Sequence, residues 1–307
     1  MMRPKSLLAG LLLITLATPL AAQERGWLDS GKQWVQQFWS DDSGQWLGRI
    51  NGAVSNHNYK GVLVFVQGDN INTLAIEHRM DNGVENLRMR TLSGMPRELV
   101  KKGGKIQRGS SEDSAQSFPA SASGQITFSH FASAEGNKWY KIRLAEKARV
   151  AGRSTQVVEI KAEDAWRYSY RLWLDTETGL PLKVITLDER GFAVEQFMFT
   201  QIEITPVPGK GKAPKRRLPP PLKSPFKEVK GFQVIASESR AGSTQYLFSD
   251  GLSSISLYVE PSKLKEKAQM HRDGVNGLML GDGNIRYVAM GKVPVATLEK
   301  ILAQTQR

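Results

Sequence analysis

The chain has 307 residues, no cysteine and a formal net charge of +12. The lack of cysteine excludes disulfides, thiol nucleophiles and cysteine-ligated metals. A net charge of +7 lies between Thr205 and Lys230; with Arg3 and Lys5 set aside, only about +3 remains elsewhere, which argues against a globally basic nucleic-acid binder.

Residues 1–22 have the pattern of an export signal. Arg3 and Lys5 precede an apolar run, Leu7–Leu16, that is too short to cross a bilayer as a helix. Small residues follow, and cleavage is expected near Ala22. The sequence therefore predicts a periplasmic protein.

A first folded unit is expected over residues 23–205. Helical spacing appears around Trp34–Trp39 and again in Trp46–Val54, and the polar run Ser40–Gly44 is expected to separate the two stretches. From Gly61 onward the apolar residues alternate instead, and Asp81-Asn82-Gly83 is a strong hairpin signal.

Further alternating segments follow the Ser-rich stretch 108–124, which is expected to be a loop. The segments at 139–147, 154–162, 166–175, 180–189 and 193–204 all suit antiparallel strands separated by short turns. The predicted fold class is mainly β (α+β), with one large curved antiparallel sheet or unclosed barrel packed against helix.

A basic, proline-rich linker is expected over residues 206–227, which contain half of the chain's fourteen prolines. Such a segment favours an extended, partly polyproline-II spacer. Its cations either contact anionic lipid or a partner protein, or only keep the spacer soluble; the candidates are Lys210, Lys212, Lys215, Arg216 and Arg217.

A smaller unit is expected over residues 228–307, with an antiparallel sheet and one or two helices. Ser249-Asp250-Gly251 predicts a turn, Pro261–Met270 is compatible with a helix, and Pro294 fits the first position of a final helix. Candidate partner contacts in this unit are Arg240, Tyr246, Tyr258 and Arg286.

Catalytic and metal-binding patterns are not found. The four histidines, His57, His78, His130 and His271, are far apart in sequence and form no known motif. We expect no enzyme activity, no cofactor and no metal site. Among the possible functions, that of a hydrolase has the least support from the sequence.

Large apolar side chains occupy both faces of several predicted strands. A sheet that is covered on one side needs such side chains on that face only. This pattern indicates a second layer, a partner or a cavity for an apolar ligand. The candidate lipid-binding residues are Phe65, Leu74, Ile76, Leu87, Met89, Trp139, Trp173, Phe197 and Phe199.

Several blocks in order resemble the RseB/MucB family, periplasmic regulators of the envelope-stress sigma factor sigma-E (AlgU). They include WLGRINGAVSNHNYKGVLVFVQG at 46–68, RYSYRLWLDTETGLPLK at 167–183 and LFSDGLSSISLYVEP at 247–261. The resemblance implies an N-terminal domain similar to LolA-type lipoprotein carriers, with a hydrophobic cavity, followed by a smaller C-terminal domain.

The resemblance further implies a non-enzymatic regulator. It would bind the periplasmic part of an anti-sigma factor (RseA or MucA type), shield it from site-1 proteolysis, and be released by lipopolysaccharide or lipid A. The alternative is a periplasmic carrier of lipids or lipoproteins without a regulatory role. Homodimerisation stays open, and nucleic acid is not expected as a partner.

Overall fold

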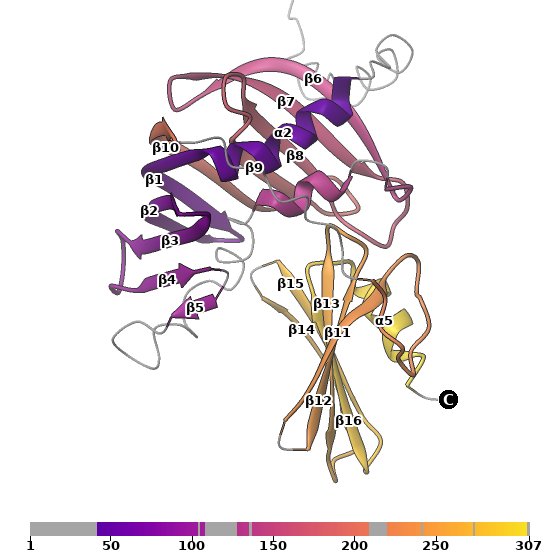
Figure 1. Cartoon of the computed structure of the whole chain (residues 1–307). Coiled ribbons are helices and arrows are strands. Elements are labelled where there is room, and N and C mark those ends of the chain that lie inside the picture. Colours follow the sequence, from indigo (N-terminus) through magenta and orange to yellow (C-terminus); the bar gives the residue numbers. More distant parts are fainter. Residues whose placement is uncertain are drawn as a thin grey trace, which may run out of the picture. The chain divides into compact units, whose positions relative to one another are not determined.

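The computed structural model describes residues 42–103, 105–107, 128–134, 137–208, 220–240, 242–272 and 274–305, all within one unit of the chain, Ser40–Arg307. The described residues form two antiparallel sheets, two α-helices and a 3-10 helix (Figure 1). The mainly β, α+β fold class predicted from the sequence is confirmed. Neither helix in the described part is long and apolar enough to cross a membrane.

The larger sheet has ten strands in the order β5-β4-β3-β2-β1-β10-β9-β8-β7-β6. Among the described strands, none pairs with the outer edge of β5 or β6, so the sheet that they form is open, as predicted. The strands are β1 (His57–Gln67), β2 (Asn70–Asp81), β3 (Val84–Thr91), β4 (Glu98–Lys102), β5 (Lys105–Gln107), β6 (Tyr140–Val150), β7 (Arg153–Ala162), β8 (Ser169–Asp175), β9 (Pro181–Leu187) and β10 (Ala193–Pro206).

The hairpin predicted at Asp81-Asn82-Gly83 joins β2 to β3. Asn82 and Gly83 both have positive φ, 48° and 79°. Two consecutive left-handed residues define the type I′ turn that matches the twist of paired strands, and Asn-Gly is its preferred sequence.

Helix α2 (Asp42–Asn56) packs Leu47, Ile50 and Ala53 into the core of the ten-stranded sheet. The predicted helical face is confirmed, but the expected break at Ser40–Gly44 is wrong for its second half, because the helix already includes Gly44. The helix tolerates this glycine because its stability comes from the buried face that follows. The Trp27–Trp39 stretch lies outside the described residues.

Thr205 and Pro206, at the predicted start of the linker, belong to strand β10. They are the last residues of the strand and pair with Asn58 and His57 of β1. On its other side β10 pairs with β9 only as far as Met198, so Pro206 removes no hydrogen bond from a central ladder.

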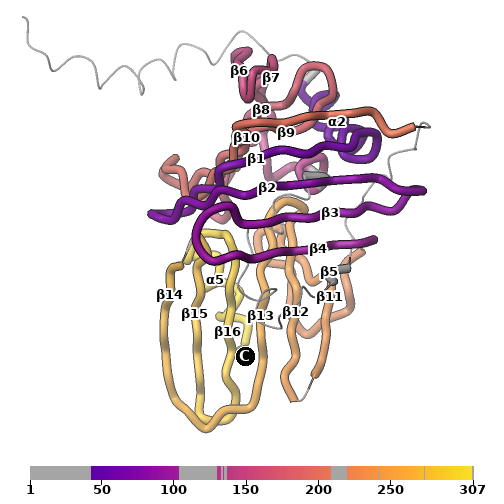
Figure 2. Tube along the Cα trace, turned by 90° about the vertical axis from the view of Figure 1, so that its left-hand side faces the viewer, coloured from indigo at the N-terminus to yellow at the C-terminus, as the bar shows by residue number. Residues whose placement is uncertain are grey.

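The smaller sheet has six strands in the order β11-β12-β13-β16-β15-β14, which Figure 2 shows side by side. Helix α5 (Val295–Leu302) packs Leu298, Ile301 and Leu302 into its core. The strands are β11 (Gln233–Arg240), β12 (Ser243–Ser249), β13 (Ser254–Pro261), β14 (Lys267–Arg272), β15 (Val275–Gly281) and β16 (Ile285–Gly291).

Two local predictions for this unit need correction. Pro261–Met270 forms no helix: it ends β13, crosses an irregular stretch and enters β14, because strand pairing with β15 outweighs its helix propensity. Pro294 lies one position earlier than expected, as the N-cap of α5. The turn predicted at Ser249-Asp250-Gly251 is confirmed between β12 and β13.

Part of the predicted linker is bound to the smaller sheet. The Leu222 amide donates to the Val234 carbonyl at 2.8 Å, and Phe226 packs edge-on against Tyr246. The cationic candidates Lys210, Lys212, Lys215, Arg216 and Arg217 lie outside the described residues, as does the stretch 108–124 expected to be a loop.

Candidate functional site

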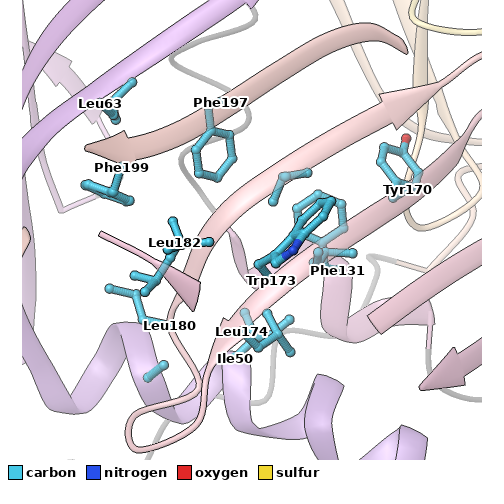
Figure 3. Packing of buried hydrophobic residues seen from close by; sticks show 14 of the residues in the cluster. Ile50, Leu63, Phe131, Tyr170, Trp173, Leu174, Leu180, Leu182, Phe197 and Phe199 are labelled. Carbon is cyan, nitrogen blue, oxygen red and sulfur yellow. The ribbon is translucent and has the colours of Figure 1, made fainter. Parts of the chain in front are cut away.

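The predicted lipid-binding side chains all belong to, or pack against, one apolar cluster in the ten-stranded sheet (Figure 3). Strand alternation places most of them on one face, here called the inner face, and these are at most 3% exposed. The inner-face candidates are Phe65, Leu74, Ile76, Leu87, Met89, Phe197 and Phe199.

The inner face is covered by helical segments. Helix α2 contributes Ile50 to the cluster, and the 3-10 helix η1 (Phe128–Ala134) contributes Phe131. The Phe131 ring meets the Tyr170 ring edge-on, with 5.2 Å between centroids. An acyl chain can therefore reach the part of the inner face beneath α2 and η1 only if one of these elements moves aside.

Trp173 lies on the opposite, outer face of the sheet. It is in register with Lys183 of β9, whereas its neighbour Leu172 is in register with the inner-face residue Val184. The ammonium of Lys183 lies 4.6 Å from the indole centroid, and the Arg171 guanidinium lies 5.3 Å from it. Burial, and then the charge of Arg171, lower the pKa of Lys183. Trp173 is thus capped by cations rather than by a helix.

Trp139 differs from the other candidates because it contacts the smaller sheet's entry segment. A Cβ on Gly231 would lie 2.2 Å from the indole nitrogen of Trp139, and Gly231 has φ of 87°. Only glycine satisfies both the close approach and the left-handed backbone. Trp139 therefore helps to join the two sheets.

A buried ion pair lies at the centre of this junction. Arg167, just before β8, donates to the Asp250 carboxylate at 2.5 Å, and both side chains are fully buried. Arg167 also donates to Asp164 and to the backbone carbonyl of Lys230. Burial opposes the charge of Arg167, but the carboxylates of Asp164 and Asp250 raise its pKa above the usual value.

Two tyrosines of the apolar cluster extend the junction. Tyr140 donates from its hydroxyl to Asp250 at 2.9 Å, and the Tyr170 hydroxyl lies 3.1 Å from the Ser253 hydroxyl. Burial, followed by the charge of Asp250, raises the pKa of Tyr140, and burial raises that of Tyr170. Both phenols therefore stay neutral. Since Tyr170 also touches Phe131, the junction is in contact with the cover of the inner face.

A second group of contacts joins the sheets at the start of β10. Lys292 forms an ion pair with Glu195, whose carboxylate also accepts from Gln67 at 2.7 Å. Asn276 donates to the Tyr168 hydroxyl at 3.1 Å. Burial lowers the pKa of Lys292, and Glu195 only partly offsets this effect.

The outer face of the larger sheet carries a groove of about 380 Å³. Charges alternate across it in register from Glu203 to Lys60, Glu77 and Arg88, and Lys60 pairs with Glu203 at 3.0 Å. The groove mixes this row of charges with apolar residues such as Val62 and Ile202, and it lies opposite the inner face. It is therefore not the hydrophobic cavity that the family resemblance implies.

The predicted partner contacts are spread over the smaller sheet. Tyr246 packs on the face covered by α5, against Phe226. Tyr258 projects from the opposite face, since its pairing partners Gln245 and Val288 alternate with core residues. Arg240 is exposed at the end of β11, and Arg286 is paired with acidic side chains, Glu260 and Glu266. The four residues do not form one cluster.

The sequence did not reveal the junction residues. Arg167 and Asp250 are separated by 83 positions, and neither belongs to a motif with a fixed spacing. The signal available was a charged residue close to aromatic and apolar residues in each of two blocks, and such residues recur elsewhere in the same blocks. Within the part of the chain that the structure describes, no group of three histidine or acidic side chains is placed to hold a metal ion.

Two antiparallel sheets, joined by buried polar contacts and each packed against an α-helix, define a mainly β protein built around two apolar cores. The MucB/RseB N-terminal domain model matches residues 42–222, and the MucB/RseB C-terminal domain model matches residues 224–306. The chain therefore belongs to the MucB/RseB family, as its sequence blocks suggested.

Curated relatives support this assignment. The chain is 26% identical over 294 residues to the sigma factor AlgU regulatory protein MucB of Pseudomonas aeruginosa, covering 85% of this chain and 89% of that protein. It is also 26% identical to the sigma-E factor regulatory protein RseB of Escherichia coli K12, with 84% and 89% covered. These relatives are named as regulators, in agreement with the prediction that the chain is not an enzyme.

Solved structures show the same arrangement. The complex structure of Pseudomonas aeruginosa MucA/MucB is similar with a TM-score of 0.66 and 27% identity, over 85% of this chain and 96% of that chain. A crystal structure of MucB matches with a TM-score of 0.60, 27% identity, and 86% and 97% coverage.

Proposed function

We propose that this chain is a periplasmic regulator of an envelope-stress sigma factor and acts by binding the periplasmic domain of an anti-sigma factor of the MucA or RseA type. The observation that carries this proposal is the match of both family domains in order, together with the likeness to MucB in a structure of a MucA/MucB complex. The export signal expected at residues 1–22 supports the periplasmic location.

Binding to the anti-sigma factor shields it from the initiating site-1 protease. Lipopolysaccharide or its lipid A part binds the inner face and lowers the affinity for the anti-sigma factor. By thermodynamic linkage the anti-sigma factor must then weaken lipid binding by the same factor. The contact between Phe131 and Tyr170 supports this coupling, because it connects the cover of the inner face to the sheet junction.

The first test is association with the anti-sigma factor. We expect the mature chain to co-elute from a gel-filtration column with the periplasmic domain of a MucA-type protein from the same genome. Arg240→Ala and Tyr258→Ala should weaken binding in calorimetry, whereas Arg149→Ala on β6 should not. Failure of the mature chain to bind such a domain under any ionic strength would reject the proposal.

The second test concerns protection and release. Site-1 protease should cleave the free anti-sigma domain quickly and the complex slowly, and lipid A fragments should restore cleavage. Neutral replacement of Lys210, Lys212, Lys215, Arg216 and Arg217 should weaken lipid binding at low salt if these cations contact phosphates. Lipid A binding of equal strength with and without the anti-sigma domain would contradict release and favour the carrier alternative.

A further inference from the structure

His78 of β2 is a buried polar side chain on the apolar inner face. It is 1% exposed, and neither of its ring nitrogens has a hydrogen-bond partner among the described residues. Its neighbours along β2 on the same face are Leu74 and Ile76, and Leu87 of β3 is directly opposite it in register. A polar group in such surroundings is normally paired, so the exception points to a missing partner.

The surroundings of His78 define what that partner is. On one side the ring stacks on Tyr59, with 4.5 Å between centroids. On the other, Nε2 lies 3.6 Å from the Glu85 carboxylate, which is too far for a hydrogen bond. Glu85 is the charged group that faces the ring, and its side chain is 15% exposed, so it marks where this part of the inner face approaches solvent.

The pair His78 and Glu85 offers one hydrogen-bond donor and one acceptor, which suits a hydroxyl group. With the proton on Nε2, the imidazole donates, while the carboxylate only accepts. A hydroxyl accepts from Nε2 and donates to Glu85 at the same time. An ionised phosphate or carboxylate has no proton to donate to Glu85, so it matches the pair less well than a hydroxyl does.

We propose that His78 and Glu85 bind the hydroxyl of a hydroxylated acyl chain, whose hydrocarbon lies against Ile76, Leu87 and Met89 once the cover of the inner face has moved. This inference rests on the proposed response to lipid and specifies the kind of chain that the inner face prefers. In the closed state the unpaired imidazole disfavours burial, and pairing with the hydroxyl removes this penalty.

The test uses two lysophosphatidylcholines below their micellar concentrations, one with a lauroyl chain and one with a 3-hydroxylauroyl chain. They differ by one hydroxyl, and their headgroups carry no net charge. Calorimetry with the mature chain should show roughly tenfold tighter binding of the hydroxylated lipid, since one satisfied buried hydrogen bond changes affinity by about that factor.

His78→Phe keeps an aromatic ring against Tyr59 and should reduce the ratio of the two affinities to about one, without weakening the lauroyl lipid. Glu85→Gln, which keeps the shape of the side chain, should lower the ratio as well. His57→Phe is the matched control, because the His57 ring already has the Ala53 carbonyl as a partner at 3.0 Å. It should retain the preference.

The outcomes separate this inference from the proposed function. Equal binding of both lipids by the unaltered chain, or an unchanged preference in His78→Phe, overturns the role of His78 while leaving the lipid response intact. In that case an ordered water is the partner of the ring. If neither lipid binds, both the inference and the lipid response are rejected.

Discussion

The guanidinium of Arg167 and the carboxylate of Asp250 form an ion pair between the two sheets, and neither side chain is exposed to solvent. Buried charges are retained when each has several hydrogen-bond partners. Asp250 meets this condition through Tyr140 and through the backbone amides of Leu252 and Ser253. The junction is therefore a specific contact with defined partners.

Removing one member of this pair should destabilise the protein strongly. We expect Asp250→Ala to lower the free energy of unfolding by about 3–5 kcal/mol, because the buried Arg167 charge loses its fully buried partner and keeps only the partly exposed Asp164 and the Lys230 carbonyl. Urea unfolding followed by tryptophan fluorescence measures this change. Arg143→Ala breaks an exposed pair with Glu159 and should cost less than about 1 kcal/mol. Equal effects of the two variants would mean that the junction does not contribute to stability.

Gly231→Ala should disrupt the contact between Trp139 and the entry of the smaller sheet. The new methyl group would overlap the indole, and the backbone is left-handed, so both effects act together. Gly242→Ala is the matched control, because Gly242 has a similar φ of 82° but nothing within 4 Å of its added Cβ. We expect a cost of about 1 kcal/mol for the control and clearly more for Gly231→Ala. Calorimetric melting temperatures provide the comparison, and identical shifts would contradict the packing argument.

Asp175 should make the larger sheet sensitive to acid. Burial alone would raise the pKa of its carboxyl group, but hydrogen bonds from Arg153 and Thr178 outweigh burial and hold the pKa below its usual value. A carboxyl with a depressed folded-state pKa stabilises the fold above the unfolded-state pKa of about 3.9. This stabilisation is lost as the pH falls through the folded-state value.

Asp175→Asn should therefore cost about 2 kcal/mol at pH 7, and the cost should shrink as the pH falls below about 3.9 and through the folded-state pKa. Unfolding curves at a series of pH values test this expectation. Asp69→Asn, in an exposed turn, serves as the control and should have little effect on the free energy of unfolding at pH 7. A constant difference between Asp175→Asn and the unaltered chain at every pH would show that the ionic interaction is not the cause.

Phe131→Ala should uncover part of the inner face. Phe131 is fully buried in η1, so its truncation costs about 3–5 kcal/mol and leaves a space among apolar side chains. We expect stronger fluorescence of N-phenyl-1-naphthylamine, reversed by lauroyl lysophosphatidylcholine. Phe248→Ala creates a comparable space in the smaller sheet and should not increase dye binding. Similar dye binding by both variants would indicate general loosening rather than a lipid site.

Much of the fold could be predicted because its signals are local. The alternation in 193–204 and the Asn82-Gly83 turn each determine their own backbone, and the structure confirms both. The helical prediction for Pro261–Met270 was wrong because β14 is stabilised by its pairing with the next strand, β15, which outweighs the helix propensity of its own residues. The same distinction applies to the start of α2, where packing overrides a polar, glycine-containing sequence.

For the candidate site, the sequence predicted which apolar side chains are involved but not how they are arranged in space. Alternation identified the apolar residues of the inner face, and it also placed Trp173 opposite Leu172. It did not reveal that α2 and η1 cover that face, because no sequence pattern says which helix packs on which strands. Nor did it reveal that His78 lies unpaired among these residues, since its neighbours in space come from β1 and β3.

The carbonyl of Lys230, which Arg167 holds, belongs to the segment through which the chain enters the smaller sheet. The covalent connection and the ionic contact therefore coincide at one place. If Arg167 and Asp250 separate, the two groups remain on one covalent chain, so their effective concentration stays high. Reassociation is then intramolecular and fast, so a transient opening would be reversed without dilution of either half.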